Sequence, residues 1–135
     1  MLKKIAHIGI AVEKLETAVE MYNKVFGLKL HCIEEFLPQK VKIAFLEIDG
    51  VKIELLEATS HESAIAKFIE KKGAGIHHIA FEVDNIEKAI EELKVKNFSL
   101  IDEKPREGAH NTKVAFLHPK STGGILLELV ESKKD

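Results

Sequence analysis

Residues 7–22 read HIGIAVEKLETAVEMY, and residues 78–93 read HIAFEVDNIEKAIEEL. At an offset of 71 residues the two stretches are identical at six of sixteen positions, and most of the other pairs are conservative. A second match joins IELLE at 53–57 with LELVE at 127–131, at an offset of 74. Two matches in the same order indicate a duplicated module.

Each module begins with the same two predicted elements. The apolar pattern predicts a strand over 5–12 in the first module and over 75–83 in the second. A helix with apolar residues at helical spacing follows each strand, and we expect it to end at Gly27 in the first module and near Asn97 in the second.

Three further strands are expected to complete each module. The clearest pair is a hairpin of 41–48 and 51–57, because Asp49-Gly50 between them is a strong two-residue turn signal. Its counterpart in the second module is 113–118 followed, after a longer turn, by 125–131.

These elements define the expected domain organisation. It is a single α+β domain over 1–135, with a βαβββ module at about 4–58, a linker helix at about 60–73 and a second βαβββ module at about 75–132. Two helix starts have the spacing of a capping box, Thr59 with Glu62 and Asp84 with Glu87.

The composition narrows the function classes. Hydrophobic residues make up 45% of the chain and charged residues 31%, which excludes a disordered tail, a collagen-like fibre and a coiled-coil rod. The net charge of −2 argues against nucleic-acid binding, and no apolar run is long enough to span a bilayer. No signal peptide is expected before the first strand, and Cys32, the single cysteine, excludes an intrachain disulfide. We therefore expect a cytoplasmic protein without nucleic-acid or membrane partners.

Four polar residues interrupt strands that are otherwise apolar: His7, Glu54, His78 and Glu128. A lone strand histidine is usually a satisfied core residue, and a lone strand glutamate usually faces water. These four, however, occupy equivalent places in the two modules, so a pseudo-two-fold pairing would bring them together. Two imidazoles and two carboxylates suit a divalent ion such as Co²⁺, Mn²⁺, Ni²⁺ or Zn²⁺, with two positions left for water or substrate. Since neighbouring strand residues face opposite sides, His77 is excluded and alignment with His7 selects His78.

The remaining histidines are weaker candidates. His118, at the end of a strand, is expected to be structural, and His31 and His61 are expected to lie on the surface. His110 lies in a loop, where functional residues are over-represented, so both a structural role and a contact to substrate remain open.

Five segments carry a resemblance to a known family: HIGIAV at 7–12, GIHHIAFEVDNI at 75–86, GAH at 108–110, FLHPK at 116–120 and GGILLEL at 123–129. With the paired modules and the His/Glu/His/Glu order, the chain resembles the vicinal-oxygen-chelate superfamily over its whole length. Within this group it is most similar to the methylmalonyl-CoA epimerases, for which the double histidine and the His-Pro-Lys…Gly-Gly stretch look specific.

The resemblance implies a fold and an activity. The two modules would form one cup-shaped, partly open mixed-sheet barrel, as in glyoxalases. The chain would be a metal-dependent isomerase that interconverts (2R)- and (2S)-methylmalonyl-CoA by removing and returning the α-proton through a metal-stabilised enolate. It would bind one divalent ion per chain, foremost Co²⁺, through His7, Glu54, His78 and Glu128. The substrate would be an acyl-CoA thioester, and a homodimer is expected.

Inversion at the α-carbon needs two acid/base groups on opposite sides of the substrate. Glu128 is expected to be one. Glu54 is the symmetric candidate for the other, whose identity the sequence leaves open. The family's further glutamate, on the strand before the hairpin turn, has no clean match here: Lys42 holds the nearest position and Glu47 lies closer to the turn. Glutamine stands at the position of Glu54 in some epimerases, and glutamate should still ligate there.

The anionic coenzyme A tail requires cations near the site. Lys72, Arg106, Lys113 and Lys120 are candidates because they flank loops, and the alternative is that each is an ordinary solvated charge.

Three other functions share the predicted fold. A lactoylglutathione lyase would use the same four ligands, but such proteins typically carry Asp-Pro-Asp-Gly where this chain has His118-Pro119-Lys120. A drug-binding resistance protein would lack the complete ligand set. An extradiol dioxygenase would use two histidines and one carboxylate, which leaves the fourth residue unexplained.

Overall fold

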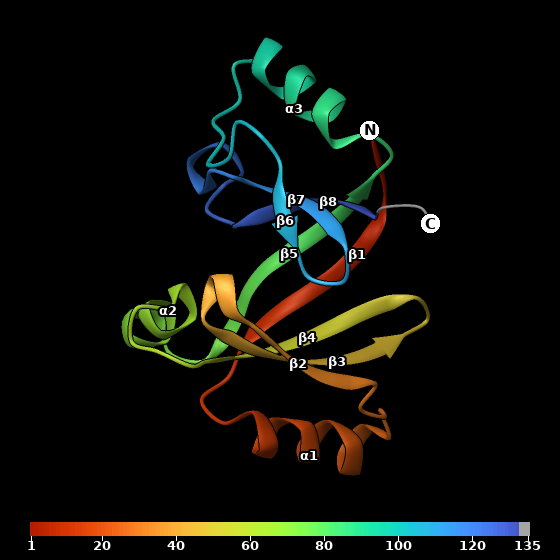
Figure 1. Cartoon of the computed structure of the whole chain (residues 1–135), viewed down its shortest axis with the longest axis vertical. Helices are drawn as coiled ribbons and strands as arrows, with labels where there is room; N and C mark the ends of the chain where they lie inside the picture. The colour runs from red at the N-terminus through yellow and green to blue at the C-terminus, as the bar shows by residue number, and fades with distance from the viewer. Residues whose placement is uncertain (133–135) are drawn as a thin grey trace. The chain divides into compact units, whose positions relative to one another are not determined.

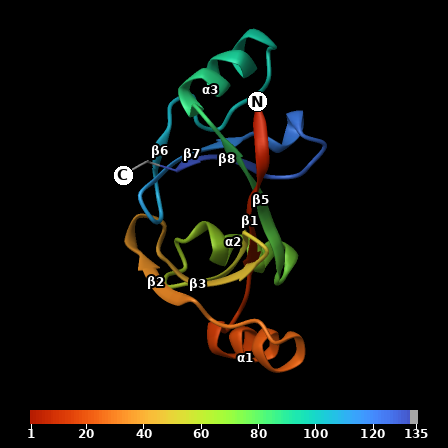
Figure 2. The same cartoon turned by 90° about the vertical axis from the view of Figure 1, so that its right-hand side faces the viewer.

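The computed structural model describes residues 1–132, which form eight strands, three α-helices and two short 3₁₀ turns (Figures 1 and 2). In chain order they are β1 (Leu2–Ala11), α1 (Leu15–Phe26), β2 (Cys32–Phe36), η1 (Leu37–Gln39), β3 (Val41–Ile48), β4 (Val51–Ala58), α2 (Ala64–Lys72), β5 (Gly75–Val83), α3 (Ile86–Val95), β6 (Arg106–Gly108), β7 (Thr112–Leu117), η2 (Pro119–Ser121) and β8 (Leu127–Ser132). The expected βαβββ order is therefore present twice.

The chain is organised in two compact units, which divide β1 between them. We call His7–His77 the first unit, and the residues from His78 onward, together with Met1–Ala6, the second unit.

In the first unit the strand order is β2-β3-β4-β1, with β1 parallel to β4 and the other pairs antiparallel. Helix α1 covers one face of these strands, where Leu15 packs with Ala44, Leu46, Ile53 and Leu55. Because side chains alternate along a strand, the residues between these apolar ones lie on the opposite face. That opposite face carries His7 and Glu54.

In the second unit the strand order is β5-β8-β7-β6, again with one parallel pair, β5 with β8. Helix α3 covers one face, where Ile86 and Ile90 pack with Ala115, Leu117 and Leu129. The opposite face carries His78 and Glu128, so each unit keeps a sheet face that α1 or α3 does not cover.

The turn predictions are confirmed in detail. Asp49 and Gly50 both have positive φ, 46° and 84°, which is the geometry of a two-residue hairpin turn. Gly27 ends α1 in the left-handed conformation with φ of 71°, and Asn97, with φ of 59°, follows the end of α3.

Both capping-box predictions are wrong. The cap of α2 is Ser63, whose hydroxyl accepts a hydrogen bond from the Ile65 N–H, so α2 begins four residues later than expected from about 60. The cap of α3 is Asn85, whose side chain accepts from the Lys88 N–H in place of Asp84. In both cases a residue closer to the first helical turn reaches the exposed N–H groups.

A repeated contact from the last strand of each module also holds the start of the module's helix. The Glu57 carboxylate accepts from the Leu15 N–H at 2.6 Å, and the Glu131 carboxylate accepts from the Ile86 N–H at 2.7 Å. A carboxylate is favourable at a helix N-terminus because it meets unpaired N–H groups and the positive end of the helix dipole. The final glutamate of the IELLE and LELVE repeat therefore belongs to the fold.

None of the helices in residues 1–132 is long and apolar enough to cross a membrane.

Candidate metal centre

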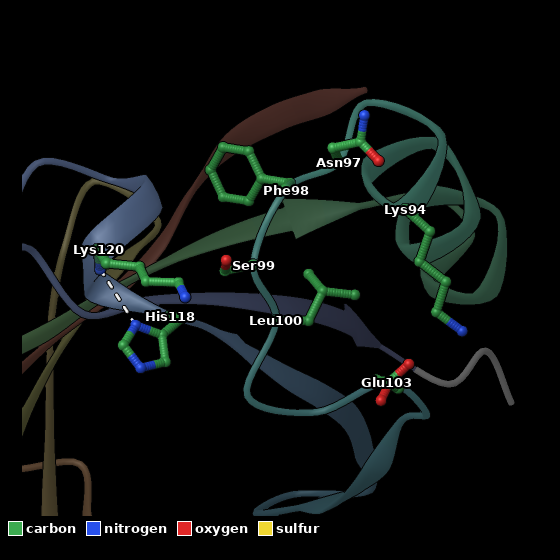
Figure 3. A pocket seen from close by; sticks show the side chains of 8 residues that line it. All are labelled: Lys94, Asn97, Phe98, Ser99, Leu100, Glu103, His118 and Lys120. Atoms are coloured by element: carbon green, nitrogen blue, oxygen red, sulfur yellow. Dashed lines mark hydrogen bonds between the residues drawn. The ribbon is translucent and has the colours of Figure 1, made fainter.

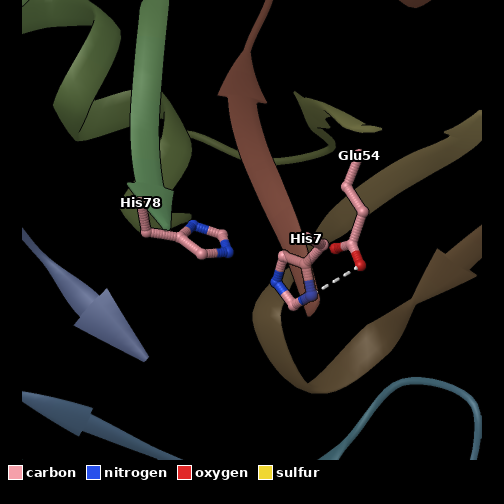
Figure 4. Close-up of side chains that lie close together, drawn as sticks. All are labelled: His7, Glu54 and His78. Atoms are coloured by element: carbon pink, nitrogen blue, oxygen red, sulfur yellow. Dashed lines mark ion pairs between the residues drawn. The ribbon is translucent and has the colours of Figure 1, made fainter. Parts of the chain in front are cut away.

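The first His–Glu pair joins β1 and β4. In the parallel register Gly9 lies beside Glu54, and His7 precedes Gly9 by two residues on the same face. Since Gly9 has no side chain, the imidazole and the carboxylate can meet diagonally across the strands. His7 Nδ1 lies 3.1 Å from Glu54 Oε2, and both side chains are 11% exposed (Figure 4).

The second His–Glu pair joins β5 and β8 in the same manner. Ala80 lies beside Glu128 in the parallel register, and His78 precedes Ala80 by two residues. His78 Nε2 lies 3.1 Å from Glu128 Oε1, and both side chains are 7% exposed. The small residue beside each glutamate, Gly9 or Ala80, therefore permits the same diagonal contact in both units.

An aromatic ring lies next to the glutamate of each pair. In the antiparallel register Phe45 on β3 faces Glu54, and Phe116 on β7 faces Glu128. The Phe116 ring also meets the His78 ring edge-on, with centroids 5.7 Å apart. Each ring therefore shares a sheet face with the carboxylate of its pair.

Sequence reasoning missed both aromatic residues, although a signal for them exists. KIAFL at 42–46 and KVAFL at 113–117 match at the same offset of 71 residues as the opening strands. This third repeat places Phe45 and Phe116 at equivalent positions in the two modules.

A cation lies over each aromatic ring. Lys52 Nζ is 6.0 Å from the centroid of Phe45, and the guanidinium carbon of Arg106 is 5.4 Å from the centroid of Phe116. Arg106 Nε also pairs with Asp102 Oδ1 at 3.1 Å, and Asp102 Oδ2 accepts from the Phe116 N–H at 2.9 Å. The arginine is thus anchored to the strand that carries Phe116.

The expected choice between the adjacent histidines of β5 agrees with the structure. His78 is buried beside Glu128, whereas the ring of His77 packs edge-on against Phe68 of α2, with centroids 5.0 Å apart. The alternation of side chains along β5 accounts for this difference.

The other histidines take the positions expected for them. His118 Nδ1 accepts from the Lys120 N–H and caps the short turn at 119–121, which is a structural role. His31 and His61 are exposed. His110 is exposed in a turn with φ of 55°.

The four candidate cations for coenzyme A differ in their surroundings. Lys113 Nζ pairs at 3.1 Å with Glu87 of α3, on the face that the helix covers, and this hydrogen bond lowers the pKa of Glu87 below its usual value. Lys113 therefore does not lie on the face with Glu128, and its pairing with Glu87 fits the alternative of an ordinary surface charge. Lys72 lies over the ring of Phe68, at 5.9 Å from its centroid.

Lys120 lies at a pocket near the end of α3. With His118 it lines a pocket of about 400 Å³, bounded by the end of α3 and the segment that follows it (Figure 3). Its contact to coenzyme A stays a prediction.

The strand register also shows on which sheet face each candidate for the second acid/base group lies. Lys42 faces Glu57, on the side that α1 covers, so it is excluded. Glu47 faces Lys52 and Glu34 faces Ile43, which places both glutamates on the same sheet face as Glu54. The sequence does not single out Glu34, because the CIEEF stretch of β2 has no clear apolar alternation.

Each His–Glu pair fits a divalent ion. Ligand atoms at about 2.1 Å from an octahedral ion are separated by about 3 Å when they occupy neighbouring positions. The imidazole nitrogen and carboxylate oxygen of each pair have this separation, 3.1 Å, and are largely buried. Imidazole and carboxylate are the donors that Co²⁺, Mn²⁺, Ni²⁺ and Zn²⁺ accept.

Comparison with known proteins identifies the family. A profile of the Glyoxalase/Bleomycin resistance protein/Dioxygenase superfamily matches residues 6–116. Methylmalonyl-CoA epimerase from Homo sapiens is 38% identical over 132 residues, which cover 97% of this chain and 75% of the human protein. The chain belongs to the methylmalonyl-CoA epimerase family of this superfamily.

Other relatives agree with this membership. A solved structure of methylmalonyl-CoA epimerase in complex with methylmalonyl-CoA and NH₄⁺ has a TM-score of 0.92 and is 36% identical, covering 98% of this chain and 96% of that chain. The uncharacterized protein YqjC of Bacillus subtilis is 40% identical over 99% of this chain and 96% of its own length. The α+β class, the glyoxalase-like fold and the enzyme class, an isomerase of the epimerase type, are confirmed.

Proposed function

We propose that this protein interconverts (2R)- and (2S)-methylmalonyl-CoA at a site where both His–Glu pairs bind a single divalent ion. The observation that carries the proposal is the repeated pair: a buried imidazole and a buried carboxylate at 3.1 Å in each unit, at equivalent positions of two modules. Burying carboxylates in apolar strands is costly unless a charge compensates them, and one shared ion would compensate both.

The proposed ligands are His7, Glu54, His78 and Glu128. When bound, the ion would supply Lewis-acid stabilisation of the negative charge that develops on the thioester oxygen as the α-proton leaves. The substrate carries a carboxylate and a thioester carbonyl on the same carbon, and these could occupy the two remaining ligand positions. Co²⁺ is the ion we propose first, with Mn²⁺, Ni²⁺ and Zn²⁺ as alternatives.

In this mechanism the chain's own carboxylates move the proton. Glu128 removes the α-proton from one face or returns it there, and a second glutamate acts on the other face. Glu54 is the symmetric candidate for the second group. Glu34 and Glu47 also lie on the sheet face of Glu54, which makes them the next residues to substitute.

The relatives support the choice of substrate. One of them is named for the epimerisation of methylmalonyl-CoA and another is a complex with this thioester. We also propose that the protein is a homodimer, which light scattering of the purified protein would test.

The deciding experiment is proton NMR of (2R)- or (2S)-methylmalonyl-CoA in heavy water with the Co²⁺-loaded protein. Loss of the α-proton signal together with appearance of the other epimer is expected. The same preparation is incubated with methylglyoxal and glutathione as a control. Formation of lactoylglutathione without exchange of the thioester proton would identify a lyase and overturn the proposal, and absence of both reactions with metal bound would overturn it as well.

A further inference from the structure

Arg106 is the single arginine of the chain, and it occupies an unusually well-anchored position. Its Nε pairs at 3.1 Å with Asp102, whose side chain is only 13% exposed, while the arginine side chain is 46% exposed. A guanidinium has five N–H donors in a rigid planar fork. Asp102 contacts the Nε edge, so the two terminal nitrogens can present donors to another anion.

The position of Arg106 on the sheet places it near the reacting groups. It faces Val114 across β6 and β7, and Val114 shares its sheet face with Phe116 and therefore with Glu128. The guanidinium lies over the Phe116 ring, at 5.4 Å, and the same ring meets His78 at 5.7 Å. A single aromatic ring thus separates the guanidinium from the proposed ligand His78.

This proximity decides which anion Arg106 can reach. The phosphates of coenzyme A are separated from the thioester by the long pantetheine arm. The free carboxylate of a malonyl-type acyl group is attached to the reacting carbon itself. A cation one ring away from His78 is therefore placed for the carboxylate, and a planar fork matches carboxylate oxygens better than the point charge of a lysine does.

We propose that Arg106 recognises the free carboxylate of the acyl group and so makes the site specific for carboxylated acyl-CoA thioesters. Asp102 is a positioning residue, because it holds the guanidinium by Nε and the strand by the Phe116 N–H. The proposal rests on the proposed function, since it concerns the same site and the same thioester.

The test compares two thioesters that differ only in the carboxylate, methylmalonyl-CoA and propionyl-CoA, by calorimetric titration of the metal-loaded protein. In Arg106→Gln, affinity for methylmalonyl-CoA is expected to fall about ten- to a hundredfold, because a charge-assisted hydrogen bond is lost. Affinity for propionyl-CoA is expected to stay unchanged. Asp102→Asn is expected to reduce the ratio of the two affinities more weakly, and Arg106→Lys is expected to restore part of it.

Lys113→Gln provides a matched control on the same hairpin, because Lys113 lies on the other sheet face and pairs with Glu87. It should leave both affinities unchanged, and thermal melting of every variant checks that it is folded. An equal loss for both thioesters in Arg106→Gln would assign the arginine to the coenzyme A part and overturn the proposal, and so would unchanged discrimination. If the unmodified protein binds neither thioester, the proposed function fails, and the proposal about Arg106 fails with it.

Discussion

The two His–Glu pairs have the same spacing but differ in the atoms they use and in their surroundings. His7 meets Glu54 through Nδ1, whereas His78 meets Glu128 through Nε2, in both cases at 3.1 Å. The ring that faces Glu54 lies under a lysine, and the ring that faces Glu128 lies under an arginine that is fixed by Asp102. Both modules have therefore kept the contact between imidazole and carboxylate, whereas the cations near the two carboxylates have diverged.

This divergence supports different chemical roles for the two glutamates that we propose as ligands. The second pair is more buried, and its histidine packs against an aromatic ring that also supports a cation. A tightly held carboxylate is the better candidate for an acid/base group whose position must be reproducible. We therefore expect Glu128 to contribute more to proton transfer than Glu54.

The largest expected effect is on metal content. It distinguishes one ion held by both His–Glu pairs from two ions, each held by one pair. The unmodified protein should hold one ion per chain, and both His7→Ala and His78→Ala should lose nearly all of it, because each variant removes one of the four proposed ligands. Elemental analysis of dialysed protein measures this. Two ions in the unmodified protein, or retention of half of the metal in a single variant, would show that each pair binds an ion of its own.

Substitution of the two glutamates separates ligand from acid/base roles. Glu128→Gln is expected to slow exchange of the α-proton about a hundred- to ten-thousandfold, the usual contribution of a general acid or base. Glu54→Gln should have a smaller effect, because we expect Glu128 to contribute more to proton transfer. The rate of deuterium incorporation and the metal content are measured on the same samples. A larger loss of exchange in Glu54→Gln, at equal metal content, would reverse the assignment.

The contacts of Glu57 and Glu131 with the helix starts are expected to affect stability and not metal binding. Glu57→Ala and Glu131→Ala should each lower the free energy of unfolding by about 1 kcal/mol, because each leaves a helix N-terminus without its carboxylate partner. Urea denaturation measures the change. If either variant instead abolished metal binding while remaining folded, that glutamate would belong to the site.

The smallest effect is expected at the exposed pair of Glu87 and Lys113. The hydrogen bond from Lys113 lowers the pKa of Glu87 below its ordinary value of 4.5. The pair therefore stabilises the native state above pH 4.5, and this contribution is lost as the pH falls through the lowered pKa. Titration of the Glu87 carboxyl carbon by NMR should show a midpoint below 4.5 that rises in Lys113→Gln. An unchanged midpoint would show that the contact does not persist in solution.

Much of the fold follows from short-range patterns in the sequence. Asp49-Gly50 and Gly27 determine a turn and a helix end through their own backbone preferences, so they could be predicted without tertiary information. The helix starts could not, because several neighbouring residues can each cap a helix. Ser63 and Asn85 prevail over Thr59 and Asp84 through positions that only the folded loops define.

The candidate residues were accessible from the sequence because they break the apolar pattern, but their supporting residues were not. Phe45 and Phe116 obey that pattern, so only the register reveals that they face the glutamates. From the sequence, Arg106 is one of four candidate cations for the coenzyme A tail, with an ordinary solvated charge as the alternative. Its contacts with Asp102 and Phe116 depend on the folded hairpin, which no local pattern encodes.

The spacing of three residues between Glu54 and Glu57, and between Glu128 and Glu131, places the two carboxylates of each strand on opposite sides of its sheet. One strand thereby determines where the reactive side chain points and where the helix behind it begins. Deleting or inserting a single residue between the two glutamates of IELLE or LELVE would place both carboxylates on the same side of the sheet. Outside their glutamates, these two pentapeptides should therefore tolerate substitution far better than any change in length.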